Sequence, residues 1–163
     1  MLALLTGFTT NAGVVLNLTN AATDTDLPPQ TLAFSLLAGP TNATLNSSSG
    51  VLNWRPLVSQ ADTTNAIIVR VADNGIPVMS ATNSYSIKIN PLAQPNLTSI
   101  SVTAGQATLV ANGDIGPDYR LLGSTNMVDW QTLLTTNPVT MPLLLSLPDS
   151  AEPQRYFRLQ LGP

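Results

Sequence analysis

The acidic residues of this 163-residue chain are its best candidates for chemistry, because the chain contains neither histidine nor cysteine. Without those two residue types, thiolate nucleophiles, disulfides and histidine acid–base catalysis are excluded. Two carboxylates stand close together in Asp24-Thr25-Asp26, and a third, Asp73, opens the segment Asp73-Asn74-Gly75. Carboxylate oxygens suit Ca²⁺, which takes about six to eight oxygen ligands. Aspartates in turns also accept hydrogen bonds from backbone N–H groups, so the residues alone leave both roles open.

Four aromatic residues form a second candidate set: Trp54, Trp130, Tyr119 and Tyr156. Aromatic faces stack on sugar rings, so the four side chains together could form a platform that binds a glycan. Each half of the chain has one tryptophan, however, and each tryptophan lies in or next to a strand pattern. This placement favours core positions over sugar contacts, because large aromatic side chains bury well between sheets.

The composition favours a structural role outside the cell. Only 9% of the residues are charged, against about 25% in an ordinary soluble domain, while 44% are hydrophobic and the net charge is −3. Because little charge repulsion opposes association, this surface suits a secreted or cell-surface subunit of a fibre or layer, and it equally suits a secreted domain with an unspecialised surface. The six Lys and Arg residues are scattered, which argues against nucleic-acid binding. No apolar run approaches the roughly 18 residues of a membrane span.

Short apolar runs alternate with turns rich in Pro, Gly, Asn and Ser, and this pattern predicts an all-β fold with two small β-sandwich domains in tandem. We predict domains at 1–91 and 96–163, joined by a linker at 92–95 that lies in a proline-containing segment. The expected strands of the first domain are 14–18, 32–37, 51–54, 66–72 and 84–89. Those of the second are 97–103, 106–111, 118–123, 129–135, 139–147 and 155–161.

The first half resembles a bacterial cadherin-like, or immunoglobulin-like, module over about residues 12–90. The stretches that carry this resemblance are 22–36, 39–45 followed by 49–56, and 69–77 with 80–82. It implies an immunoglobulin-like sandwich in which Asp24, Asp26 and Asp73 meet at one pole and hold Ca²⁺. The sequence departs from the cadherin pattern in lacking a glutamate in residues 1–15 and in having only Asp62 between the middle strands. Turn capping by the three aspartates therefore stays open beside calcium binding.

The second half resembles a fibronectin type III-like C-terminal module over about residues 112–163. The residues that carry this resemblance are Tyr119-Arg120-Leu121-Leu122, the segment 124–130, and Arg155-Tyr156-Phe157. Modules of both families serve as spacers, adhesion modules or appendages of enzymes, so the resemblance implies a protein without catalysis of its own.

The remaining expectations concern partners. Residues 1–8 are apolar and strand-prone; they form either an edge strand of the first domain or a strand donated to a neighbouring copy. We expect a non-enzymatic structural or adhesive protein that self-associates through its module ends or through residues 1–8. The alternatives are a polysaccharide-binding module of a secreted enzyme and an inert spacer. Glycosylation sequons begin at Asn17, Asn42, Asn46 and Asn96.

Overall fold

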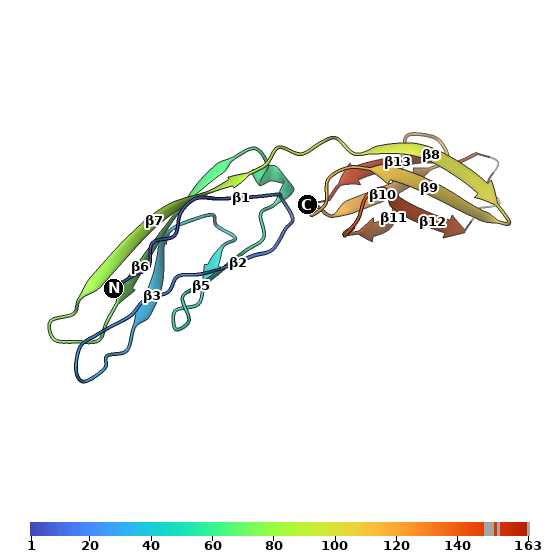
Figure 1. The fold of residues 1–163 in the computed structure, drawn as a ribbon. Helices are drawn as coiled ribbons and strands as arrows, with labels where there is room; N and C mark the ends of the chain where they lie inside the picture. The colour runs from blue at the N-terminus through green and yellow to red at the C-terminus, as the bar shows by residue number, and fades with distance from the viewer. Residues whose placement is uncertain (149–151, 153, 163) are drawn as a thin grey trace. The chain divides into compact units, whose positions relative to one another are not determined.

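The structure, a computed structural model, describes residues 1–148, 152 and 154–162. The described chain is all-β, as predicted, and it divides into two compact units (Figure 1). We call them module 1, comprising residues 1–10, 14–56 and 62–90, and module 2, comprising residues 11–13, 57–61 and 91–163.

Module 1 is a β-sandwich of two sheets. The larger sheet has the strand order β1-β7-β6-β3, and the smaller has the order β2-β5-β4. The strands of the larger sheet are β1 (Phe8–Thr10), β3 (Ala33–Ala38), β6 (Thr64–Ala72) and β7 (Ser80–Ile89). Those of the smaller sheet are β2 (Leu16–Thr19), β4 (Thr44–Leu45) and β5 (Val51–Trp54). The neighbouring strands pair antiparallel except β1, which runs parallel to the end of β7.

Period-two alternation builds the core of module 1, because successive residues of a strand point to opposite faces of its sheet. On β6, Ile67 and Val69 are fully buried, and on β7 Ile87 and Ile89 are fully buried. Trp54 of the opposite sheet has no exposed surface, and its indole Nε1 donates a hydrogen bond of 3.0 Å to Asn42 Oδ1. The amide of Asn42 in turn donates to the Arg55 carbonyl oxygen at 2.8 Å. Asn42 thus satisfies the one polar group that Trp54 brings into the core.

Module 2 is a second sandwich, with the sheets β12-β9-β8 and β11-β10-β13. Its strands are β8 (Asn96–Thr103), β9 (Gln106–Asn112), β10 (Tyr119–Ser124), β11 (Gln131–Thr136), β12 (Leu143–Pro148) and β13 (Tyr156–Leu161). Leu109, Leu121 and Leu145 form the centre of its core, one from each of three strands. Ala104 and Gly105 join β8 to β9 with φ angles of 50° and 75°. Two consecutive left-handed residues give the tight hairpin turn that matches strand twist.

Several element boundaries differ from the sequence predictions. The strand expected at 139–147 begins at Leu143, and the one expected at 129–135 begins at Gln131. In each case the residues before the strand belong to a bend, and the apolar residues in that bend led to a strand prediction that began too early. The two-residue strand β4 and the single 3-10 turn of the described residues, η1 at Val58–Gln60, were not expected. Both are too short to show a periodic pattern.

The Trp54–Asn42 hydrogen bond gives a stability prediction for module 1. Replacing Asn42→Ala leaves the buried indole N–H without an acceptor, and we expect a loss of about 1–3 kcal/mol in the free energy of unfolding. The control is Asn17→Ala, because the Asn17 side chain accepts its hydrogen bond from the Asn53 amide on the exposed face of β2. Urea unfolding followed by tryptophan fluorescence measures both variants, and equal stabilities would contradict the assignment.

Tyr119 gives the corresponding prediction for module 2. It is fully buried, and its hydroxyl donates to the Asp114 carbonyl oxygen at 2.7 Å. Tyr119→Phe should therefore lower the free energy of unfolding by about 1 kcal/mol, whereas Tyr156→Phe, which removes a long exposed bond of 3.4 Å, should leave it almost unchanged.

Burial also raises the pKa of Tyr119 above the ordinary 10.0. The folded state thus favours the neutral phenol, and its contribution to stability should be lost as pH rises above about 10.

Candidate functional site

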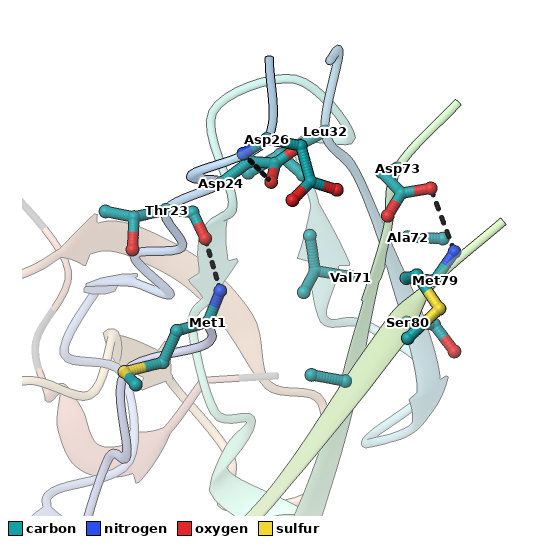
Figure 2. A pocket seen from close by; sticks show the side chains of 11 residues that line it. Met1, Thr23, Asp24, Asp26, Leu32, Val71, Ala72, Asp73, Met79 and Ser80 are labelled. Carbon is teal, nitrogen blue, oxygen red and sulfur yellow. Dashed lines mark hydrogen bonds between the residues drawn. The ribbon is translucent and has the colours of Figure 1, made fainter. Parts of the chain in front are cut away.

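Asp24, Asp26 and Asp73 come together at one end of module 1, although they are far apart in the sequence. Asp24 and Asp26 lie in the loop between β2 and β3, and Asp73 directly follows β6. All three line a hollow of about 250 Å³, with the nearly buried Val71 among its other lining residues (Figure 2). We call these three carboxylates the acidic pole. A hydrogen bond of 2.8 Å from the Thr31 backbone N–H to Asn74 Oδ1 ties the two loops together.

Two of the three aspartates cap their own turns. Asp24 Oδ1 accepts a bond of 3.1 Å from the backbone N–H of Asp26. Asp73 Oδ1 accepts two, from Gly75 N–H at 3.0 Å and Met79 N–H at 2.9 Å (Figure 2 shows the second). These are the Asx interactions that shape turns, so turn capping is a real role of Asp24 and Asp73.

Whether the acidic pole can also bind a cation depends on the carboxylate oxygens that cap no turn. Asp24 Oδ2 is buried and has no hydrogen-bond partner within the described chain. A buried carboxylate oxygen without a donor is costly unless a cation or water meets it. Within the described residues, however, no three carboxylates are close enough together to form a ready set of metal ligands. Any cation here would need Asp24 Oδ2 together with backbone carbonyl oxygens or water molecules.

Large apolar side chains project beside the acidic pole, and the sequence analysis did not single them out. Ile76 is fully exposed and Leu27 is 89% exposed, and both occupy the same two loops as the aspartates. Val78 and Met79 are also more than half exposed. Their placement follows from loop geometry, which the alternation of apolar and polar residues along strands does not encode.

The four aromatic candidates do not form a platform. Trp54 and Tyr119 have no exposed surface, so neither can stack on a sugar in this fold. Trp130 is only partly buried, and its indole N–H donates to the Met127 carbonyl oxygen at 3.0 Å. The expectation of a core position is therefore wrong for Trp130: it closes its own turn, and Tyr119 is the fully buried aromatic residue of module 2.

Residues 1–8 lie along their own module. Leu2 is buried and forms an isolated antiparallel bridge with Ala22, and regular strand pairing begins only at Phe8. The ring of Phe8 meets that of Tyr85 edge-to-face, with centroids 6.1 Å apart. Within one copy, this segment thus follows the edge-strand alternative, in two short pieces rather than one strand. No helix among the described residues is long and apolar enough to cross a membrane.

Module 2 has a groove that the sequence analysis missed. It lies between the edge strands β8 and β13, measures about 390 Å³, and includes Leu97, Ile100, Leu109 and Phe157 in its lining. The Arg155 guanidinium carbon stands 5.3 Å above the ring centroid of Phe157. We call this feature the β8–β13 groove.

The inner face of β8 is poorly covered along this groove. Ile100 pairs with Leu109 and Val102 with Ala107. Directly opposed residues of an antiparallel pair share a face, so Ile100 and Val102 point to the side on which Leu109 and Ala107 are buried. Ile100 is nevertheless 53% exposed and Val102 57% exposed. The opposing sheet therefore leaves the inner face of β8 open to water.

Comparison with known proteins finds distant likenesses of shape alone. No family model matches it, and no curated protein matches it. Among solved structures, the human desmocollin-1 ectodomain is 15% identical over 96% of this chain and 39% of that one, with a TM-score of 0.42. Immunoglobulin domains 1–5 of Sidekick-1 are 12% identical over 90% of this chain and 32% of theirs, with a TM-score of 0.47.

An enzyme structure is similar to the same degree. An endo-fucoidan hydrolase from glycoside hydrolase family 107 is 16% identical over 83% of this chain and 23% of that one, with a TM-score of 0.43. This chain thus spans less than half the length of the three proteins. At such identities and TM-scores the likenesses carry no argument about function, and the description of both modules as sandwiches rests on their sheets.

Proposed function

We propose that this chain is a non-catalytic structural or adhesive element of the bacterial exterior, secreted or on the cell surface, that associates with copies of itself. Module 1 acts as the cadherin-like part and module 2 as the fibronectin type III-like part. The two sandwiches provide rigid bodies, and the contacts between copies form at module ends.

The observation that carries this proposal is the open edge of β8. Seven of its eight residues are exposed, and none is charged. Soluble proteins usually protect an edge strand with charges, a proline or a cover, because unpaired N–H and C=O groups invite pairing with another chain. Pro95 lies just before β8 and the strand has one irregularity near Leu97, but neither protects its centre. The low charge of the whole chain supports the same role, because it leaves little repulsion between copies.

Self-association gives the first test of this function. The wild-type chain should form species larger than a monomer in sedimentation velocity as its concentration rises from about 1 to 100 μM, a range that covers ordinary protein affinities. Val102→Lys places a charge on the open inner face of β8 and should suppress these species. Val139→Lys is the control, since Val139 is 82% exposed outside the strands. A wild-type chain that stays monomeric throughout would overturn the proposed function.

We also propose that the acidic pole binds Ca²⁺, and Asp24 Oδ2 is the observation that favours it. This oxygen is buried and lacks a donor, while two further carboxylates line the same hollow. A bound cation would satisfy Asp24 and reduce the repulsion among the three carboxylates. Its effect would be to stiffen the two loops that carry Leu27 and Ile76.

Calcium binding should raise the melting temperature of module 1. At about ten times the dissociation constant, a ligand stabilises the folded state by about 1.4 kcal/mol, which for a module of this size raises the melting temperature by roughly 6–11 °C. The measurement compares melts in Ca²⁺ and in EGTA. Asp24→Asn should remove the shift, whereas Asp62→Asn, a turn aspartate that does not line the hollow, should keep it. No shift in the wild-type chain would refute the calcium proposal and leave turn capping as the role of these residues.

A further inference from the structure

The β8–β13 groove exposes apolar side chains to water. Its apolar lining includes Leu97, Ile100 and Phe157, and Val102 extends the same inner face of β8 beyond it. A half-exposed apolar side chain on the inner face of a sandwich gains stability when another apolar surface removes it from water. The natural ligand of this groove is therefore an apolar projection.

The rim of the groove carries a positive charge. Arg155 lines the groove and lies over the Phe157 ring, an arrangement that holds the guanidinium at the rim. No Asp or Glu is among the described residues that line the groove, although Arg155 also lines a second hollow together with Asp129 and Glu152. The groove thus suits a projection that carries carboxylates beside its apolar tip.

Module 1 carries such a projection. Its two tied loops expose Leu27 and Ile76 almost completely and hold the acidic pole next to them. Among the described residues that line that hollow, the one cationic group is the amino group of Met1, which donates a hydrogen bond to the Thr23 carbonyl oxygen, so the three carboxylates leave it negative. The projection and the groove are thus complementary both in apolar character and in charge.

We infer that the acidic pole and apolar loop tips of module 1 dock into the β8–β13 groove of module 2 in a second copy of this chain. The inference rests on the proposed function, since it names the two surfaces through which copies associate. The two surfaces differ, so the contact is head-to-tail, and a pair of copies keeps one free projection and one free groove. Repetition of such a contact gives an open polymer unless its rotation closes a ring.

A charge exchange tests this pairing directly. Asp26 is the residue to change on module 1, because its side chain is exposed and, unlike Asp24 and Asp73, it is not seen to cap a turn. In EGTA and about 20 mM salt, where exposed charges are weakly screened, Asp26→Arg and Arg155→Glu should each weaken association about tenfold. Mixing the two single variants should restore association, because each supplies the partner that the other needs. Lys88→Glu, which changes net charge equally on β7 of module 1, should leave association unchanged.

Two further substitutions test the apolar part of the proposed contact. Ile76→Ser and Ile100→Ser remove side chains that are 102% and 53% exposed in the single copy, so each should weaken association at least about tenfold with little change in melting temperature. Val139→Ser is the matched control. If the wild-type chain associates but these variants and the charge exchange leave its affinity unchanged, this inference fails and the proposed function stands. If the wild-type chain does not associate at all, both fail.

Discussion

The structure of each module depends on one constraint: the apolar face of a sheet must be covered by the face of another sheet. In module 1 the cover is nearly complete, since Ile67, Val69, Ile87 and Ile89 meet an opposite sheet that buries Leu52 and Trp54. In module 2 the cover is complete only at the centre, around Leu109, Leu121 and Leu145. It fails at β8, where Ile100 and Val102 face inward but remain more than half exposed. The proposed role in assembly follows from this one incomplete layer.

Besides the capping aspartates, asparagine amides serve as polar partners of the turns. Asn46 accepts hydrogen bonds from the backbone N–H groups of Ser48 and Ser49, and Asn126 accepts from those of Val128 and Asp129. Asn20 is fully buried and donates to the Gly50 carbonyl oxygen at 3.0 Å. Gly50 has a φ of +68°, and a Cβ there would lie 2.4 Å from the Asn20 carbonyl oxygen, so only glycine fits. Turns built in this way need few ionic groups, which explains how an ordered chain can have only 9% charged residues.

Short apolar runs bounded by turns were enough to predict the strands of both modules to within a few residues, except the short strands β1 and β4. They were also enough to place Trp54. The position of Trp130 could not be predicted in this way, since its environment depends on how the turn before β11 folds back. The meeting of Asp24 and Asp26 with Asp73 came from the family resemblance and not from residue spacing. The groove could not be predicted at all: Ile100 and Val102 have the pattern of core residues, and only the extent of the opposing sheet shows that they are exposed.

The central claim is that the open edge and inner face of β8 are covered by a second copy. Hydrogen–deuterium exchange of the β8 amides, measured in dilute and in concentrated wild-type protein, tests it most directly, because pairing or burial of an edge slows exchange. The account predicts that amides of β8 exchange more slowly at high concentration, while those of the central strand β6 stay unchanged. Equal exchange of β8 at the two concentrations would contradict it.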